Sequence, residues 1–173
     1  LSCCTKGDVK IANNYLASLA KVLEAKIDFA YPKENTLEEV LKKIKSLPVS
    51  DKPILLIEPA DNIGGGTPGD ATDLLSRLLQ TDQEGIVAII NDPDSVQKCH
   101  QSKVGNEIEL YVGAKFDNFH GDPIKIKAII HKLSDGKFTL KNKQSHLASM
   151  MGMHIDMGLS AALKTNQLTL LLT

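Results

Sequence analysis

The chain contains no tryptophan and few other aromatic residues, with four Phe and three Tyr among 173 residues. It therefore lacks the aromatic stacking surfaces that single-stranded nucleic-acid binders use. A strong excess of one charge is also missing, because 20 Lys and Arg against 21 Asp and Glu give a formal net charge of -1. No apolar run reaches the roughly 18 residues that a membrane span needs. We therefore expect neither nucleic acid nor membrane among the partners.

Cysteine is scarce and its spacing does not suit a metal site. The three cysteines are Cys3, Cys4 and Cys99. Adjacent Cys3 and Cys4 would point to opposite faces of a strand, so they would share neither a metal nor a disulfide. Idle or buried thiols are typical of a reducing compartment, and the first residues lack the charged and apolar regions of a signal peptide. We expect a cytoplasmic location.

The first half of the chain alternates helical and strand patterns. Apolar spacing over residues 8 to 26 predicts an amphipathic helix that begins after Asp8. Thr36, with Glu39 three residues later, resembles a capping box and predicts a second helix. After Asp92, whose Pro and Asp neighbours resemble a helix start, we expect a further short helix over 94 to 101.

Two short apolar runs, 54–57 and 85–90, have the composition of buried strands. A helix between them, over 68–79, would complete a βαβ unit with parallel strands and a right-handed crossover. Beyond Gly105 the pattern alternates with period two, which indicates antiparallel or mixed strands. The prediction is an α/β protein with a βαβ-containing N-terminal half and mixed strands in its C-terminal half, forming a single domain over 1–173. Exposed strand edges in the C-terminal half would allow pairing between subunits, so a homo-oligomer is one possible assembly.

The most informative segment is the glycine-rich loop between the predicted strand 54–57 and the helix that follows it. Its residues 61–70 read DNIGGGTPGD. Consecutive glycines are expected where the backbone needs a positive φ or where another group approaches the backbone closely. The residues of the loop alone leave three interpretations open: a structural turn, a substrate-facing loop and a nucleotide-binding loop.

The hypothesis of nucleotide binding depends on the spacing of the glycines, and the charges of the loop argue against it. Gly64, Gly66 and Gly69 match a dinucleotide fingerprint, with Asp92 in a position to bind a ribose. However, Thr67 to Asp70 resembles a capping box with proline at the first helical position, which places a carboxylate where a pyrophosphate needs bare N–H groups. A P-loop would need a Lys where Asp70 stands.

Three blocks of the sequence resemble the C-terminal domain of the microcystinase C (MlrC) family of metallopeptidase-like proteins. They are EPADNIGGGTPGDATDLLSRLL, IINDPDSVQKCHQSKVG and VGAKFDNFHGDPIKIKAII, in the order of the family between about residues 54 and 130. Ile63 replaces the usual proline of the first block, and Ala114 replaces a glycine before Lys115. The resemblance implies that zinc-binding Glu, Asp and His residues belong to a preceding N-terminal domain, and that this chain is an excised portion of a two-domain protein.

The histidines offer no metal motif of their own. They are His100, His120, His131, His146 and His154, without a His-x-x-x-His pair or a Glu-x-x-His arrangement. His154 lies among Met150, Met151, Met153 and Met157, which we interpret as adaptable core packing rather than thioether ligands. The chain also lacks a Gly-x-Ser-x-Gly nucleophile motif. We therefore expect no catalytic residue and no metal in this region alone.

The sequence leads to the hypothesis of an accessory domain that packs on a zinc-bearing N-terminal domain and helps to form the cleft of an amide hydrolase acting on a small peptide-like substrate. Backbone N–H groups of the glycine run would contact a substrate carbonyl or its oxyanion. The candidate cleft residues are Asp61, Asn62, Gly64, Gly65, Gly66, Asp70, Lys115 and His120. The alternatives are a nucleotide-binding module and a purely structural or interaction domain.

Overall fold

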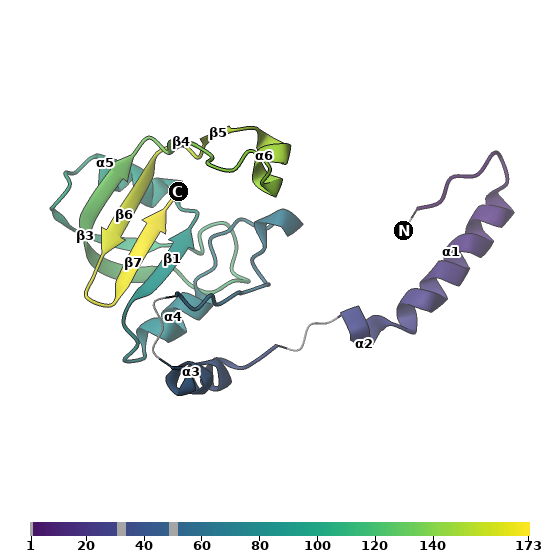
Figure 1. The fold of residues 1–173 in the computed structure, drawn as a ribbon, viewed down its shortest axis with the longest axis horizontal. Helices are drawn as coiled ribbons and strands as arrows, with labels where there is room; N and C mark the ends of the chain where they lie inside the picture. The colour runs from purple at the N-terminus through teal and green to yellow at the C-terminus, as the bar shows by residue number, and fades with distance from the viewer. Residues whose placement is uncertain (1, 31–33, 49–51) are drawn as a thin grey trace. The chain divides into compact units, whose positions relative to one another are not determined.

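The structure is a computed structural model that describes residues 2–30, 34–48 and 52–173. The chain divides into two compact units, residues 1–55 and residues 56–173 (Figure 1). In the described residues, no helix is both long and apolar enough to cross a membrane.

The described residues of the first unit form three helices, of which the first and third begin where the local sequence predicts and the second was not predicted. They are α1 (Val9–Glu24), α2 (Ile27–Ala30) and α3 (Leu37–Ser46). The Asp8 side chain accepts a hydrogen bond from the Ile11 N–H at 2.9 Å, and Thr36 and Glu39 form the predicted capping box. Each cap satisfies helix N–H groups that have no intrahelical partner. None of the three helices contains a buried residue.

The second unit is a mixed sheet with helices, which confirms the predicted α/β class. Its elements are η1 (Ile63–Gly65), α4 (Asp73–Leu79), β1 (Ile86–Ile90), α5 (Pro93–His100), β2 (Glu107–Val112), β3 (Ile124–Ser134), β4 (Lys137–Thr139), α6 (His146–Met151), β5 (His154–Asp156), β6 (Ser160–Lys164) and β7 (Leu168–Leu172). The strand order of the main sheet is β1-β7-β6-β3-β2, and β4 pairs with β5 in a separate ribbon. β1 and β7 are parallel, whereas all the other neighbours are antiparallel.

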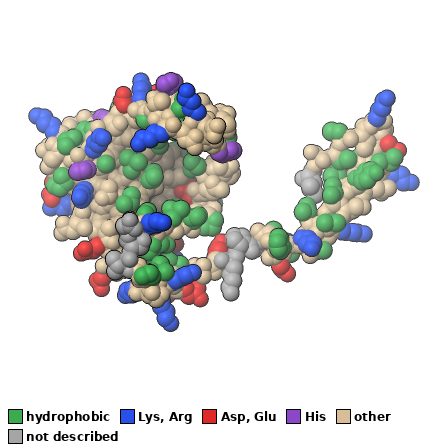
Figure 2. Space-filling model, viewed as in Figure 1, with side chains coloured by type: hydrophobic (Ala, Val, Ile, Leu, Met, Phe, Trp, Pro, Cys, Tyr) green, Lys and Arg blue, Asp and Glu red, His purple; other side chains and the backbone are tan. Residues whose placement is uncertain are grey.

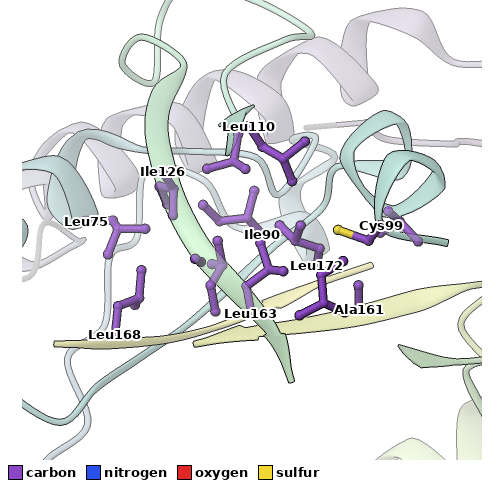
Figure 3. Close-up of a cluster of buried hydrophobic side chains, with 14 residues drawn as sticks. Leu75, Ile90, Cys99, Leu110, Ile126, Ala161, Leu163, Leu168 and Leu172 are labelled. Carbon is purple, nitrogen blue, oxygen red and sulfur yellow. The ribbon is translucent and has the colours of Figure 1, made fainter. Parts of the chain in front are cut away.

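One face of the sheet carries the hydrophobic core. Residues that alternate along each strand, such as Ile90, Ile130, Leu163 and Leu170, have almost no exposed surface. Leu75 of α4 and Cys99 of α5 belong to the same cluster, so both helices pack on this face (Figure 3). The sheet and its core therefore lie entirely within 56–173, and the assignment of 1–55 to the same domain stays a prediction.

Two boundary predictions are wrong. Residues 54–57 form no strand, and Leu55 and Ile57 are 81 % and 78 % exposed. A strand needs a paired neighbour for its N–H and C=O groups, and the parallel partner of β1 is β7 rather than this segment. The helix predicted from Pro68 begins only at Asp73, because Asp70 is turned inward by contacts with a distant loop.

Candidate functional site

The glycine-rich loop is held in shape by two of its own polar side chains. The Asp61 carboxylate accepts hydrogen bonds from the Gly69 N–H at 2.9 Å and the Ala71 N–H at 2.7 Å. Asn62 caps the short 3-10 helix η1, because its Oδ1 accepts from the Gly64 N–H at 3.0 Å. These bonds across eight and ten residues close the loop on itself.

The N–H groups of the glycines in this loop already have partners. The Gly64 N–H donates to the Asn62 side chain, while those of Gly65 and Gly66 donate to the carbonyls of Asn62 and Ile63. The Gly69 N–H donates to Asp61. A phosphate bound at the fingerprint glycines would need these same donors, so the geometry disfavours a nucleotide at this loop.

The tip of the loop is exposed and open. Gly64, Gly65 and Gly66 are all exposed. A Cβ atom built on Gly65 or Gly66 meets no atom of the described residues within 4 Å. Gly66 has a φ of 95°, which favours glycine, but Gly65 lies outside the left-handed region. The glycine at position 65 is therefore not required by any contact within the described residues.

Asp70 is a buried anchor rather than an exposed acid. Its side chain is inward, with 1 % of the residue exposed, and Oδ2 accepts from the N–H groups of Lys115 at 2.7 Å and Phe116 at 3.2 Å. The Asp70 carbonyl also accepts from the Ala114 N–H, and Ala114 has a φ of 46°. Asp70 Oδ1 has no hydrogen-bond partner among the described residues. Asp70 thus fastens the glycine-rich loop to the segment after β2.

Lys115 and Asp92 form a buried ion pair beside this anchor. The Lys115 Nζ donates to Asp92 Oδ1 at 2.6 Å, to Asp92 Oδ2 at 2.7 Å and to the Ser95 hydroxyl at 3.0 Å. Burial raises the pKa of Asp92, but hydrogen bonds from Lys115, Ser95 and the Gly113 N–H outweigh it, so the pKa of Asp92 lies below its ordinary value of 3.8. All three ammonium protons of Lys115 have acceptors, which leaves none for a substrate.

His120 links two loops at the start of α4. Its carbonyl accepts from the N–H groups of Thr72 at 2.9 Å and Asp73 at 3.3 Å, which satisfies the helix N-terminus. Its ring Nδ1 lies 3.0 Å from Asp117 Oδ1. The hydrogen bond to Asp117 is the main reason that the pKa of His120 is raised above 6.5, with further contributions from the charge of Asp61 and the backbone of Ala60 and an opposing one from burial.

The polar candidates are thus connected, whereas the glycine tip stands apart from them. Asp61, Asp70, Lys115 and His120 belong to one network that joins the glycine-rich loop to the segments after β1 and β2. A cavity of about 180 Å³ adjoins this network. It is lined by Asn91, Asp92, Pro93, Asp94, Lys115 and Phe116. It is smaller than the roughly 300 to 1,000 Å³ of ordinary ligand sites, so this cavity alone does not enclose a substrate.

Sequence reasoning missed the pairing at the centre of this network. Asp92 was expected only as a helix start or ribose ligand, and it does cap α5 by accepting from the Ser95 N–H at 3.0 Å. Its ion pair with Lys115 joins residues 23 positions apart. β1 and β2 lie at opposite edges of the sheet, so no local pattern in the sequence indicated that the residues following them would meet.

The described residues contain no group of three His, Cys, Asp or Glu side chains placed to hold a metal. The histidines have other surroundings: His100 Nε2 lies 3.1 Å from the Ser160 carbonyl, and His154 Nδ1 lies 3.2 Å from the Thr139 hydroxyl. The methionines were expected in the core, and that prediction is wrong. Met150, Met151 and Met157 are all exposed, because α6 and β5 lie in an excursion outside the main core.

Comparison with known proteins identifies the family. Residues 56–173 match the family model described as MlrC C-terminus, so the chain belongs to this family. The chain is 31 % identical to microcystinase C from Sphingomonas sp. over 84 residues, which are 48 % of this chain and 17 % of that protein. This confirms the resemblance seen in the glycine-rich blocks.

A solved structure shares the fold. The crystal structure of a candidate metallopeptidase from Mesorhizobium sp. BNC1 aligns with 94 % of this chain and 31 % of its own, with a TM-score of 0.73 and 21 % identity. At this identity the likeness concerns the fold alone. The chain spans less than a third of that protein.

Proposed function

We propose that residues 56–173 are the accessory C-terminal domain of a metal-dependent amide or peptide hydrolase, and that the glycine-rich loop 61–70 borders its substrate cleft. Family membership and the names of the two relatives support the class. In this proposal zinc is bound by a preceding domain, since the described residues offer no ligand set. The zinc would supply an activated water and polarise the substrate carbonyl.

The observation that carries the proposal is the glycine at position 65. Ten of the 12 glycines in the chain have a positive φ, which gives each a conformational reason to be glycine. Gly64 and Gly65 are the exceptions, and at Gly64 a Cβ would lie 3.2 Å from the Asn62 Oδ1. At Gly65 neither reason applies. A glycine without an internal reason is expected where an external group approaches the backbone closely.

The hydrogen bonds of the loop refine what it would do for a substrate. Because the N–H groups of Gly64, Gly65 and Gly66 donate within the loop, they are poor candidates for an oxyanion contact. The carbonyl groups of Gly64 and Gly65 accept no hydrogen bond from the described residues. We propose that they accept from the N–H groups of a peptide-like substrate and so position it. Asp61, Asn62 and Asp70 would hold the loop, and Lys115 and His120 would brace the segments behind it.

The test is Gly65→Ala in a longer polypeptide that carries the preceding domain. We expect kcat/KM on an amide substrate to fall roughly tenfold or more, because small displacements of a positioned substrate are costly, while zinc content stays unchanged. Gly65→Val should lower it further. Urea unfolding of Gly65→Ala is the control, and its midpoint should change little because a Cβ at this position meets no atom of the described residues within 4 Å. Unchanged turnover in both variants defeats the cleft role.

A structural domain without a site is the second candidate, and one observation favours it. Asp61, Asn62 and Asp70 all direct their side chains to backbone N–H groups of this chain rather than to solvent. The two candidates differ at Gly65, since a purely structural loop tolerates an alanine there in every assay. The coding sequence upstream is a further test: absence of a preceding metal-ligand domain contradicts the hydrolase proposal.

A further inference from the structure

The main sheet has a second face, opposite to the core, and at β1 and β7 this face is apolar and open. Val87 and Ile89 of β1 point to it and are 73 % and 66 % exposed. The sheet register places Thr169 and Leu171 of β7 beside them and Ala162 of β6 next in the row. Within residues 56–173, all of which are described, none of these outward side chains is fully buried. Figure 2 shows hydrophobic side chains on the visible face of this sheet.

This exposure is unusual for strands of this kind. Parallel strands are normally covered on both faces, whereas β1 and β7 are covered only on the core face, where α4 and α5 pack. Val87 and Ile89 together expose more apolar surface than an isolated surface residue does, and grouped apolar exposure marks an interaction site. Within residues 56–173, the outward apolar face of β1 and β7 therefore lacks a covering layer.

The backbone of β1 has N–H and C=O groups at the free edge of the sheet that no neighbouring strand pairs within residues 56–173. The Ile86 N–H donates to the Gln167 carbonyl and the Ile90 carbonyl accepts from the Thr173 N–H, so these alternate residues face β7. The N–H and C=O groups of Val87 and Ile89 consequently point to the free edge of the sheet. β1 contains none of the Lys, Pro or bulge features that usually protect an edge strand.

The opposite edge of the sheet differs in this respect. There the outward residues of β2 are Glu107, Glu109 and Tyr111. Glu109 and Glu107 pair with Lys125 and Lys127 of β3 at 2.9 Å each. Charges at an edge oppose association with another strand. The two edges of one sheet thus contrast, and only β1 is suited to a partner.

The free edge of β1 leads directly into the glycine-rich loop. Asn91, which follows β1, donates its N–H to the Gly69 carbonyl and its Nδ2 to the Pro68 carbonyl, both at 2.8 Å. The glycine-rich loop is therefore in direct contact with the residue that follows β1.

The charges that border the apolar face indicate the chemistry of the partner. Lys164 of β6 and Lys132 of β3 point to the same face, next to Thr169 and Ala162 in the sheet register. Neither lysine has an ion-pair partner among the described residues. No Asp or Glu lies among the outward residues of β1, β7 and β6. A complementary surface is therefore apolar with flanking carboxylates.

We infer that the edge and outward face of β1 are the docking surface for the domain that precedes this region in longer family proteins, and that this domain presents an apolar surface flanked by acidic side chains. The inference rests on the proposed function, which supplies such a domain. The length of the relatives supports this occupant, since the chain covers 17 % of microcystinase C and 31 % of the Mesorhizobium protein. A second copy is less suitable, because a two-fold contact would set the lysine-bordered patch against itself.

Cysteine labelling in the longer polypeptide tests this surface without measuring activity. Val87→Cys is compared with Tyr111→Cys, which lies on the same face at the opposite edge and is 58 % exposed. The background carries Cys3→Ser and Cys4→Ser, while Cys99 is buried and is kept. With a maleimide probe we expect Val87→Cys to react at least tenfold more slowly than Tyr111→Cys in the folded protein, and both to react equally fast in urea.

Equal rates in the folded protein overturn the inference. If the protection of Val87→Cys disappears on dilution, the face is covered by a second copy of the chain. If the protection disappears in a Leu55→Asp/Ile57→Asp variant, the face is covered by the segment 54–57. Either result overturns the preceding domain as occupant. The outcome is independent of the cleft proposal. Protection of Val87→Cys together with unchanged turnover of Gly65→Ala keeps the docking surface and removes the cleft role. Lost turnover of Gly65→Ala together with equal labelling rates keeps the cleft role and removes the docking surface.

Discussion

Replacing Lys115 by Met would expose the energetic role of the buried ion pair behind the glycine-rich loop. Met keeps much of the aliphatic length of the lysine but removes the charge, so Asp92 is left with an unpaired carboxylate whose side chain is 1 % exposed. Removing one partner of a buried pair costs about 3 to 5 kcal/mol. The Lys115 side chain is 28 % exposed, so water can replace part of the interaction, and we expect a loss of about 2 to 4 kcal/mol.

Urea unfolding followed by far-ultraviolet circular dichroism measures this loss. With an m value of about 2 kcal/mol/M, the midpoint should fall by about 1 to 2 M. The matched control is Lys127→Met, which removes an exposed pair with Glu107 whose side chains are 63 % and 55 % exposed. Such surface pairs contribute about 0 to 1 kcal/mol. A Lys115→Met midpoint no lower than that of Lys127→Met refutes the reasoning.

The pH dependence of the same variant provides an independent check. In the native protein the pKa of Asp92 is lowered, so the stability it contributes is present above its unfolded pKa of 3.8 and is lost as the pH falls through its folded pKa. Without Lys115, burial dominates and the pKa of Asp92 should rise. The difference between the native protein and Lys115→Met should therefore shrink as the pH is lowered from 7 toward 4. A difference that does not change with pH argues against an unpaired Asp92 carboxylate.

Three further predictions concern neighbouring residues. Gly113→Ala should lower the free energy of unfolding by about 1 to 3 kcal/mol. The reason is that Gly113 has a φ of 68° and a Cβ there would lie 2.5 Å from Thr72 Cγ2. Stability equal to that of Gly65→Ala would contradict this. Asp61→Ala should lower the free energy of unfolding by about 1 to 3 kcal/mol and accelerate amide hydrogen exchange at Gly69 and Ala71. Unchanged exchange would show that Asp61 does not hold the loop. For His120, whose pKa is raised, the stability it contributes is complete below its unfolded pKa of 6.5 and is lost as the pH rises through its folded pKa. Nuclear magnetic resonance titration should show this pKa falling in Asp117→Asn, and an unaltered titration would reject the proposed cause.

The features that local sequence predicts well are the helix starts. Asp8, Thr36 and Asp92 each cap a helix as expected, because a cap is formed within three residues of itself. The strands β1, β2, β3 and β7 also lie where the apolar patterns predict. The glycine-rich blocks were sufficient to identify the family, which the match over 56–173 confirms.

The features that could not be predicted depend on distant parts of the chain. Asp70 was expected to begin a helix, but the N–H groups of Lys115 and Phe116, more than 40 residues away, bind its carboxylate. The run at 54–57 has the composition of a buried strand, yet composition does not supply a neighbouring strand. The exposed methionines of α6 likewise show that an apolar cluster in the sequence does not specify which surface covers it.

We propose that the tip of the glycine-rich loop borders the substrate cleft, which would place it near the metal ion held by a preceding domain. The most direct measurement places a nitroxide at Gly65→Cys, in a Cys3→Ser/Cys4→Ser background, and compares its electron paramagnetic resonance spectrum with Mn²⁺ and with diamagnetic Zn²⁺ in the metal site. We expect dipolar broadening with Mn²⁺ that is absent with Zn²⁺. Identical spectra with the site filled by either metal would contradict it.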